Sequence, residues 1–510
     1  MTENKGKIFL IGAGPGDPLL ITLKAVECIQ NADVVVYDYL AAPALLEYAS
    51  KNSEIIYVGK KGGDHTLSQD GINDLIIQKA KSGLKVARLK GGDPFIFGRG
   101  GEEAELIAKN NIPFEIVPGV TSAIAAPAYA GIPLTHREHA SSVSIITGHE
   151  NPQKKDSTME WERFAHSTNT LVFLMGVKNL PGIVKNLVKF GKDPKTPIAL
   201  VRWGTTPKQE SVSGTLDNIV EIVNKANLKS PAIIIIGSVV TLKEKLKWFE
   251  NRPLLGKKIV VTRARAQASN FIKLLRNAGA QCIEIPTIEI MPPEDNKALE
   301  QSIDNIKSFD WVIFTSVNGV KFFFDTLYSK NKDVRILGHL KFACIGPVTK
   351  ETLREYGIIS DVLPDTYKAE SVIKAFSDKN IKGRHILIPR AKKARAVLPL
   401  ELIKMGAEVE EVTAYETKLS DHGKDTLINM LENNEIDMVT FTSSSTIENF
   451  VKLLPKDQSK KLLKTFTSAC IGPITEKTAI SLGINPDIVA DEYTIEGLMN
   501  SILDHFNTNN

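Results

Sequence analysis

The stretch from position 86 to position 103 holds residue types that suit ligand binding. An alternating apolar run, Val86–Leu89, predicts a short strand, and a glycine-rich loop that carries Asp93 and Arg99 follows it. Glycine lets a backbone turn sharply and approach a ligand closely. Glu102-Glu103 then begins a predicted helix, at the end where the helix dipole favours acidic groups. The pattern predicts either a ligand-binding loop at the carboxyl end of a strand or an ordinary strand-to-helix turn.

Length and composition place the chain among globular proteins. Its 510 residues are enough for about three or four domains, and 43% of them are hydrophobic and 24% charged. A net charge of +4 is small for this length and does not indicate a nucleic-acid partner. Any acidic ligand must therefore be met by local basic groups.

Membrane and metal chemistry are not expected. No apolar run reaches the length of a membrane span, and the first residues do not form a signal peptide, so a cytoplasmic protein without a membrane partner is predicted. The cysteines form no Cys-x-x-Cys or Cys/His cluster, so no metal site is predicted. All four lie among apolar neighbours, which predicts buried thiols at Cys28, Cys282, Cys344 and Cys470.

Strands alternate with helices along the first part of the chain, which predicts a parallel sheet. The expected elements are strands near 7–11, 32–37, 55–58 and 86–89, and helices near 22–31 and 66–82. Ligands gather beyond the carboxyl ends of the strands in such sheets. Polar side chains follow each expected strand and mark that edge as a candidate site: Asp17, Asp38, Lys60 and Asp93.

The loop after the first strand, Gly12–Pro18, partly matches the dinucleotide fingerprint Gly-x-Gly-x-x-Gly. Positions 17 and 18 are Asp and Pro, and the third glycine, which permits close packing of helix on strand, is missing. A nicotinamide-dependent dehydrogenase is therefore an alternative that rests on this loop alone.

A second subdomain is expected after Pro118-Gly119, a pair that is typical of a hinge. Thr121 or Ser122 is expected to cap a helix of small residues that extends to Tyr129. Further strands are predicted near 142–147, 171–176, 198–203 and 232–236.

Together these motifs resemble the tetrapyrrole methylase family, and within it uroporphyrinogen-III C-methyltransferase. The resemblance extends over residues 7 to about 246, and the order and density of its motifs make it specific. The motifs are the Gly12–Pro18 loop, Tyr37-Asp38, Val58-Gly59-Lys60, the Arg88–Glu103 stretch, Val117–Ser122, Ala126–Arg137, Ala140–Val143, Met175-Gly176 and Gly204–Pro207. The resemblance implies two mixed α/β subdomains with S-adenosylmethionine folded in the cleft between them.

The resemblance also implies roles for single residues. Asp38 corresponds to the family's proposed proton acceptor, and Lys60 corresponds to its proposed proton donor. The tetrapyrrole substrate carries many carboxylates, so Arg99 and Arg137 are candidates for binding it, with solvated loop charge as the alternative. The positions that correspond to residues holding S-adenosylmethionine are Pro15, Gly91, Gly92, Asp93, Ile96, Thr121, Ser122, Met175 and Gly204.

Departures from the family pattern affect the substrate side more than the cofactor side. Tyr39 stands where many relatives have Arg, Leu174 where many have Tyr, and Arg202-Trp203 where Glu-Arg is common. They leave the reaction class intact. A reduced pyrrole carbon attacks the sulfonium methyl in line, and a carboxylate and a lysine suit the proton transfers that must accompany the attack.

The second part of the chain repeats itself. Gly256–Ala264 returns as Gly383–Ala391, an offset of 127 residues (383 minus 256), and Asp310–Ser316 returns as Asp437–Ser443 at the same offset. A period this long indicates a duplicated domain instead of a solenoid. Each copy alternates strands with helices, so we expect a pair of doubly wound parallel-sheet domains related by internal duplication.

Hydroxyl pairs end one predicted strand in each copy, at Thr315-Ser316 and at Thr442-Ser443. Such residues cap helices, and helix amino ends also bind carboxylates. Capping alone explains either pair. Binding of substrate carboxylates in one cleft between the domains explains why both copies have it.

This half resembles uroporphyrinogen-III synthase from about residue 256 to residue 503. The resemblance is carried by Val261-Thr262-Arg263, Phe314–Val320, Ile345–Thr349, Pro364–Glu370, Ala414-Tyr415-Glu416 and Phe441-Thr442-Ser443. It implies two domains joined by a pair of crossing segments, which we place near 286–292 and 413–417.

Tyr415 corresponds to the family tyrosine proposed to assist departure of the substrate hydroxyl; the alternative is a strand aromatic packed at the hinge. Arg263 and Arg390 are candidates for binding the acetate and propionate groups, and solvated surface charge is again the alternative. The expected domains are a methylase half at 1–250, with subdomains of about 1–118 and 119–250, and a synthase half at 251–510, with domain one at about 256–287 plus 418–505 and domain two at about 293–412.

The two resemblances imply a bifunctional enzyme of tetrapyrrole biosynthesis. The second half would cyclise hydroxymethylbilane to uroporphyrinogen III with inversion of the last ring. The first half would add two methyl groups from S-adenosylmethionine to give precorrin-2, for sirohaem or cobalamin synthesis. The family suggests a homodimer through the methylase half. In the alternative, the second half is a non-catalytic tetrapyrrole-binding or regulatory module.

Overall fold

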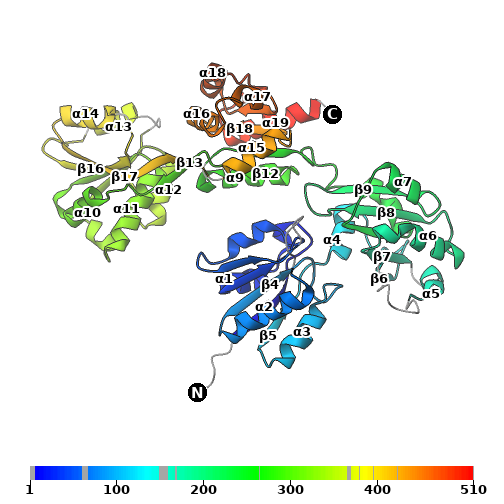
Figure 1. The fold of residues 1–510 in the computed structure, drawn as a ribbon. Coiled ribbons are helices and arrows are strands. Elements are labelled where there is room, and N and C mark those ends of the chain that lie inside the picture. Colours follow the sequence, from blue (N-terminus) through cyan, green and yellow to red (C-terminus); the bar gives the residue numbers. More distant parts are fainter. Residues whose placement is uncertain are drawn as a thin grey trace. The chain divides into compact units, whose positions relative to one another are not determined.

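The chain folds as two compact units, each an α/β structure as the sequence predicts (Figure 1). The computed structural model describes residues 6–59, 67–148, 159–166, 169–263, 265–364, 369–377, 379–393, 396–421 and 423–508. The first unit contains Met1–Lys258, Leu274–Gln281 and Phe506–Asn510, and the second contains Ile259–Lys273 and Cys282–His505. Within the described ranges, no helix has both the length and the apolar character needed to cross a membrane.

The first sheet, blue in Figure 1, is wholly parallel and has the strand order β3-β2-β4-β1-β5. Its central strands are buried on both faces: Ile8 and Leu10 pack into one apolar cluster, and Phe9 and Ile11 pack into the other. This order brings the carboxyl ends of β1, β2 and β4 side by side. The elements are β1 (Lys7–Gly12), η1 (Pro18–Leu20), α1 (Leu23–Gln30), β2 (Val34–Tyr37), η2 (Pro43–Tyr48), β3 (Glu54–Tyr57), α2 (Gln69–Lys81), β4 (Lys85–Lys90), α3 (Gly100–Lys109) and β5 (Phe114–Val117).

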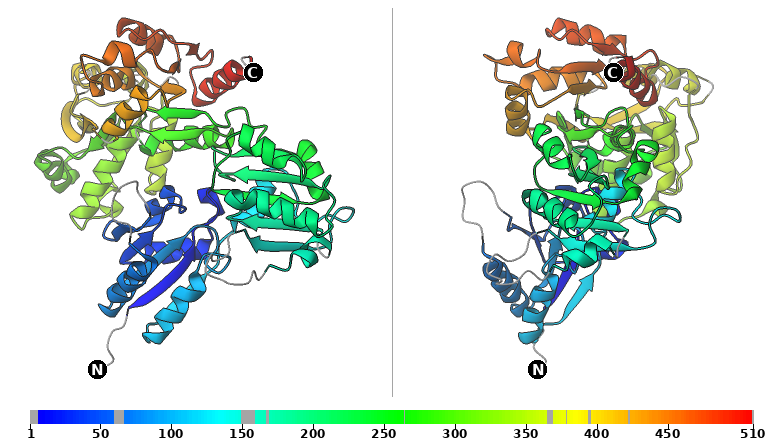
Figure 2. Two further views of the ribbon diagram at one scale, coloured as in Figure 1. Left: turned by 45° about the vertical axis from the view of Figure 1, so that its right-hand side comes forward. Right: turned by 90° about the vertical axis from the view of Figure 1, so that its right-hand side faces the viewer.

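The second sheet has the order β6-β7-β10-β8-β9 and is mixed. Only β6 and β7 are parallel; the other neighbouring strands are antiparallel. These strands lie side by side in the left view of Figure 2, coloured turquoise to green. Its elements are α4 (Ser122–Tyr129), β6 (Val143–Thr147), α5 (Trp161–His166), β7 (Thr170–Leu174), η3 (Val177–Asn179), α6 (Leu180–Lys189), β8 (Pro197–Arg202), β9 (Glu210–Thr215), α7 (Ile219–Lys225), β10 (Ala232–Ile236), η4 (Ser238–Leu242) and α8 (Lys243–Leu246).

The third sheet, β12-β11-β18-β19-β20, joins strands that are far apart in the sequence. The strand β11 pairs in parallel with β18, with Ile259 opposite Met438. The elements are β11 (Lys258–Val261), α9 (Arg265–Asn277), β12 (Gln281–Glu284), α15 (Lys424–Glu432), β18 (Met438–Phe441), α16 (Ser444–Leu453), α17 (Ser459–Leu462), β19 (Thr467–Cys470), α18 (Pro473–Ser481), β20 (Ile488–Val489) and α19 (Ile495–Thr508).

The fourth sheet, β13-β17-β16-β14-β15, repeats this order with an added antiparallel edge strand, β13. The expected crossing segments correspond to β13 and the last part of β17, which pair with Ile288 opposite Leu419. The elements are β13 (Ile288–Met291), α10 (Lys297–Asp304), η5 (Ile306–Ser308), β14 (Trp311–Phe314), α11 (Val317–Ser329), η6 (Val334–Leu337), β15 (Lys341–Cys344), α12 (Pro347–Glu355), α13 (Ala369–Phe376), β16 (His385–Ala391), α14 (Val397–Lys404) and β17 (Glu408–Leu419).

The duplication is therefore assembled with exchanged halves. In the sequence repeat, β11 and β12 correspond to β16 and β17, and β14 and β15 correspond to β18 and β19. In the structure, the first half of one copy shares a sheet with the second half of the other. Of the four thiols expected to be buried, Cys282 is only half-buried, because it lies on the edge strand β12.

Candidate functional site

A cavity of about 930 Å³ lies in the first unit, beyond the carboxyl ends of β1, β2 and β4. Loops of both sheets line it: the turn after β1, the loop after β4, the start of α4, and the turns after β7 and β8. The cofactor candidates that line it are Pro15, Gly91, Gly92, Ile96, Thr121, Ser122, Met175 and Gly204. The structure thus brings together residues that are up to 189 positions apart (204 minus 15).

Glycine is required where the loops of the cavity meet. Gly14 and Gly92 exchange two backbone hydrogen bonds, of 3.2 and 2.7 Å, and Gly92 has a left-handed φ of 70°. A Cβ atom on Gly119 would lie 2.4 Å from the Gly92 carbonyl oxygen and 2.6 Å from the Gly12 Cα. These contacts hold the backbones at the cavity wall closer together than any side chain would allow.

Asp93 is the cofactor candidate that does not line the cavity. Its Oδ1 accepts hydrogen bonds from the backbone N–H groups of Phe95 and Ile96, at 2.8 and 3.1 Å. Its Oδ2 accepts from the N–H of Gly119 at 3.0 Å. In this structure Asp93 therefore orders the glycine loop and ties it to the segment that leads into α4.

Three non-glycine residues of the cavity wall have left-handed backbones: Phe97, Met175 and Trp203, with φ of 53°, 57° and 47°. Such conformations cost about 1–3 kcal/mol each and persist where the surrounding structure enforces them, most often at functional sites. The Trp203 ring lies against Tyr39, with centroids 5.8 Å apart. Two positions at which the sequence departs from the methylase pattern thus meet in one wall of the cavity.

Asp38 follows β2 and also lines the cavity. Its Oδ1 accepts from the Leu40 N–H at 3.1 Å, and its Oδ2 accepts from Arg88 Nη2 at 3.1 Å. Lys60, the expected proton donor, lies outside the described residues.

The predicted substrate arginines of this unit lie outside the cavity lining. Arg99 is exposed, and its guanidinium pairs with Glu102 at 2.7 Å, which raises the pKa of Arg99. Arg137 is exposed in the loop after α4. Two lysines that sequence reasoning did not select, Lys178 and Lys208, line the cavity instead. Both follow strands of the second sheet, and this position after a strand is the sequence feature that could have identified them.

Asp17 joins the two sheets of the first unit. Its backbone N–H donates to Thr205 Oγ1 at 3.0 Å, and its carboxylate accepts from the Tyr129 hydroxyl at 2.9 Å. Burial, followed by the bond to Asp17, raises the pKa of Tyr129. The phenol therefore remains a hydrogen-bond donor at any ordinary pH.

In the fourth sheet, Tyr415 is buried with its hydroxyl 3.0 Å from Ser316 Oγ, and its ring stacks on Phe322. Ser316 also caps α11 by accepting from the Gly319 N–H at 3.1 Å. Thr315 precedes it at the same strand end. Arg390, on β16, is buried and pairs with Glu411 at 2.7 Å.

In the third sheet, Ser443 caps α16, and its backbone N–H donates to Thr446 Oγ1 at 3.3 Å. Thr442 and Arg263 follow the neighbouring strands β18 and β11, so all three candidates share one sheet edge. Burial lowers the pKa of Arg263, which is half-buried. The synthase candidates thus form two sets, one on each sheet.

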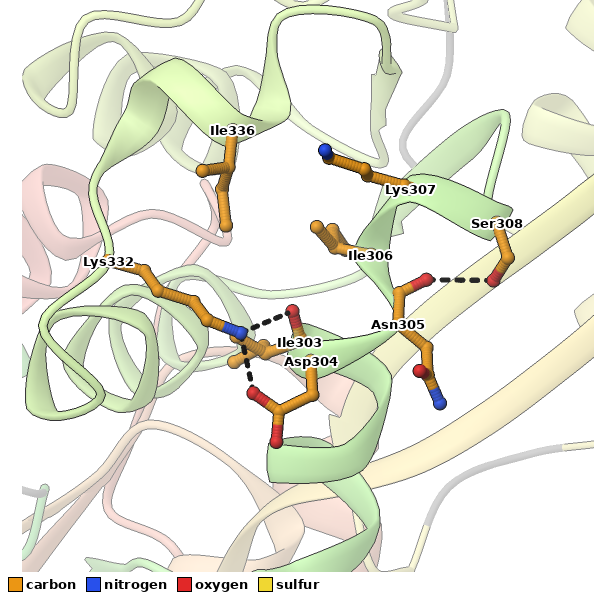
Figure 3. Close-up of a pocket in the computed structure, with 8 residues that line it drawn as sticks. All are labelled: Ile303, Asp304, Asn305, Ile306, Lys307, Ser308, Lys332 and Ile336. Carbon is orange, nitrogen blue, oxygen red and sulfur yellow. Dashed lines mark hydrogen bonds and ion pairs between the residues drawn. The ribbon is translucent and has the colours of Figure 1, made fainter.

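A second cavity, of about 560 Å³, is lined by residues of α10, η5 and η6 (Figure 3). In it, Lys332 donates to the Ile303 carbonyl at 3.3 Å and pairs with Asp304. These elements precede β14 and β15, so this cavity lies at the amino ends of the strands, away from Ser316 and Tyr415.

Among the described residues, one group has the side chains to hold a metal ion: His136, Glu138 and His139, whose ligand atoms lie within 4.8 Å of one another. The loop is partly exposed, and the Nδ1 of His136 accepts the Glu138 N–H at 3.2 Å. The sequence search for cysteine-containing clusters could not have found it.

Two family models match the chain. The model described as Tetrapyrrole (Corrin/Porphyrin) Methylases matches residues 7–220, and the model described as Uroporphyrinogen-III synthase HemD matches residues 269–500. The "Porphyrin biosynthesis protein HemD" of Ruminiclostridium josui is 37% identical over 98% of this chain and 98% of its own length.

Two further relatives match about half of the chain. An "S-adenosyl-L-methionine-dependent uroporphyrinogen III methyltransferase" of Methanosarcina barkeri is 51% identical over 48% of this chain and 96% of its own length. A solved uroporphyrin-III C-methyl transferase of Thermus thermophilus, complexed with S-adenyl homocysteine, is 39% identical, covers 46% of this chain and all of its own, and has a TM-score of 0.40. The full-length match and the two family models confirm both resemblances inferred from the sequence: the chain belongs to the family of porphyrin-biosynthesis proteins in which a tetrapyrrole methylase is followed by a uroporphyrinogen-III synthase.

Proposed function

We propose that the chain converts hydroxymethylbilane to uroporphyrinogen III with its second half and methylates that product twice, to precorrin-2, with its first half. The main support is the cavity of about 930 Å³, which is lined by Asp38 and by eight residues expected to hold S-adenosylmethionine. Precorrin-2 of this origin would serve sirohaem or cobalamin synthesis.

The cavity suits S-adenosylmethionine in size and in lining. Its volume lies in the range of about 300–1,000 Å³ that is usual for small-molecule sites. Gly91, Gly92 and Gly204 expose backbone at the wall, and Ile96 and Met175 supply apolar surface. When bound, S-adenosylmethionine supplies an electrophilic methyl group.

Asp38 is proposed to take the proton that the macrocycle loses after methylation. The carboxylate lies in the cavity wall, and each of its oxygens accepts only one hydrogen bond among the contacts described, so lone pairs remain for a proton. Lys60 is proposed as the proton donor, from its place in the motif. Lys178 and Lys208 add positive charge for the substrate carboxylates.

Tyr415 is proposed to assist departure of the hydroxymethylbilane hydroxyl, held by Ser316 at 3.0 Å. Arg263, Arg390 and the hydroxyl pairs Thr315-Ser316 and Thr442-Ser443 are proposed to bind the acetate and propionate groups. The free amides at the helix ends beside those hydroxyls favour carboxylates.

We further propose a homodimer through the methylase half and a cytoplasmic location. The proposed domains are 1–250, with subdomains of about 1–118 and 119–250, and 251–510, with domain one at about 256–287 plus 418–505 and domain two at about 293–412. The methylase sheets β3-β2-β4-β1-β5 and β6-β7-β10-β8-β9 support the two subdomains.

The test for the synthase half uses the whole chain with hydroxymethylbilane and no S-adenosylmethionine. Separation of the uroporphyrin isomers after oxidation should show the type III isomer. Type I alone, the product of the uncatalysed reaction, would leave the second half as a non-catalytic tetrapyrrole-binding module. Binding of S-adenosylhomocysteine without binding of NAD disposes of the dehydrogenase alternative.

A further inference from the structure

A buried chain of charged side chains stands behind the Asp38 carboxylate. Arg88 lies on β4, next to β2, and its Nη2 donates to Asp38 Oδ2 at 3.1 Å. The Arg88 side chain is only 3% exposed, whereas that of Asp38 is 28% exposed and reaches the cavity. The guanidinium therefore contacts Asp38 from the protein side.

The guanidinium of Arg88 is itself held from several directions. Its Nη1 donates to the Leu89 carbonyl at 2.8 Å, and its Nε lies 3.9 Å from Glu103 Oε1. Glu103 is wholly buried, and the same oxygen accepts from Lys90 Nζ at 2.6 Å and from Gln69 Nε2 at 2.9 Å. Lys90 and Gln69 thus fix the Glu103 carboxylate, which stands beside the guanidinium as an ion pair without a hydrogen bond to its Nε.

The cluster adds little to the stability of the fold, so stability alone does not explain its presence. Two cations, Arg88 and Lys90, are matched by two carboxylates, Asp38 and Glu103, so its net charge is zero. Buried ion pairs lose about as much by desolvation as they gain by attraction, and apolar replacements often match them in stability. The strands around the cluster are otherwise filled by apolar side chains.

Of the two buried cations, Arg88 is the one that contacts Asp38. Burial, followed by the charge of Arg88, lowers the pKa of Lys90, although Glu103 opposes the shift. A guanidinium does not lose its proton in proteins. Its hydrogen bond to an ionised carboxylate is short, directional and stronger than a neutral one.

We propose that Arg88 is a positioning residue for Asp38: it fixes the direction of the carboxylate that faces the cavity, while Glu103 and Lys90 keep the guanidinium in place. The inference rests on the proposed methyl transfer and on the role of Asp38 in it. Arg88 does not line the cavity, so it acts through Asp38 and has no contact of its own with substrate.

The test is a double-mutant cycle in the full-length protein, with uroporphyrinogen III and isotope-labelled S-adenosylmethionine. Arg88→Met should lower kcat by about 30-fold or more, the size expected when a proton-transfer group is misplaced. The KM for S-adenosylmethionine and the affinity for S-adenosylhomocysteine should change by no more than about twofold. In an Asp38→Asn background, Arg88→Met should lower kcat by no more than about twofold further, because coupled residues are not additive.

Arg88→Lys covers the case in which Arg88→Met does not fold. Lysine keeps the positive charge but lacks the planar guanidinium with its several N–H donors, so kcat should fall by about fivefold. This loss should vanish in the Asp38→Asn background. Lys79→Met is the matched control. It removes the ion pair between Lys79 on α2 and Glu54 on β3, and it should keep wild-type kcat.

Two results would overturn the role of Arg88: wild-type kcat in either Arg88 variant, or losses that multiply in full with that of Asp38→Asn. A wild-type protein that releases no S-adenosylhomocysteine from these substrates would instead contradict the proposed function. The two failures are therefore distinguishable.

Discussion

The methylase cavity and the synthase strand ends both lie at the carboxyl edges of sheets, yet they are built by different means. Around the cavity, backbone meets backbone: a Cβ atom on Gly12 or on Gly119 would collide with the other glycine and with the carbonyl oxygen of Gly92. At the synthase edges, side-chain hydroxyls provide the polar groups, and Ser316 and Ser443 each cap a helix. The first construction shapes a cavity, and the second presents separate groups.

The comparison indicates how each half meets its ligand. Backbone contacts and left-handed residues shape the methylase walls. The synthase groups belong to two sheets, and the two copies are not equivalent: Ser316 contacts Tyr415, whereas Ser443 contacts Thr446 and Ser445. The same helix cap occurs in both copies, and among the described residues only the cap at Ser316 has a buried tyrosine, Tyr415, beside it.

The comparison is sharpened most by Asp38→Asn. This change should lower methyl transfer by about 100-fold, because it removes a proton acceptor and keeps the side-chain volume. S-adenosylhomocysteine should still bind, since the cofactor candidates are untouched. Turnover and calorimetric binding on the same preparation check both expectations; unchanged turnover would remove Asp38 from the mechanism.

Gly119→Ala should break the backbone construction of the cavity. The added Cβ would meet backbone atoms of Gly92 and Gly12 at 2.4 and 2.6 Å, so the glycine loop must shift. We expect the affinity for S-adenosylhomocysteine to fall by about tenfold or more, as overpacking typically costs about 1–3 kcal/mol. Gly101→Ala, where no atom lies within 4 Å, is the matched control and should bind normally. Normal binding by Gly119→Ala would mean that the close approach is not needed.

Ser316→Ala and Ser443→Ala compare the two copies of the synthase cap. Each should lower the free energy of unfolding by about 1 kcal/mol through loss of the cap. Only Ser316→Ala should also slow formation of uroporphyrinogen III, by a few-fold, because only Ser316 contacts Tyr415. Equal effects on the rate would show that the copies act alike.

An effect confined to alkaline pH is expected from two buried thiols at corresponding strand ends, Cys344 and Cys470. Burial raises the pKa of Cys344 to about 11 and that of Cys470 to about 12, from an ordinary value of 9.0. The folded state thus keeps protons that the unfolded state releases, so this stability is complete below pH 9 and is lost as pH rises through the folded values. Denaturant unfolding at pH 8 and at pH 10.5 should show a smaller decline in a Cys344→Ala/Cys470→Ala variant; an equal decline would refute the assignment.

Local pattern predicted most of the elements that surround the site. The apolar runs at 7–11 and 86–89 became β1 and β4, and Thr121 caps α4 as its position suggested. These features depend on neighbours in the sequence, so periodicity and capping reveal them. The edge strand β9, Glu210–Thr215, was missed because it is polar and pairs on one side only.

Tertiary partners could not be predicted in the same way. Glu103 reads as an acidic residue at a helix start, yet it is wholly buried against Lys90. Asp93 reads as a ligand-binding carboxylate, yet its oxygens hold Gly119 and its own loop. The exchanged halves of the duplication rest on long-range strand pairing, so local pattern does not reveal them; the split of domain one into about 256–287 and 418–505 was expected from the family resemblance alone.

The most direct test of the bifunctional account is the product that the whole chain forms from hydroxymethylbilane and S-adenosylmethionine. We predict a dimethylated tetrapyrrole of the type III series, precorrin-2, with two molecules of S-adenosylhomocysteine released for each one. Unmethylated uroporphyrinogen, or products of the type I series alone, would contradict it.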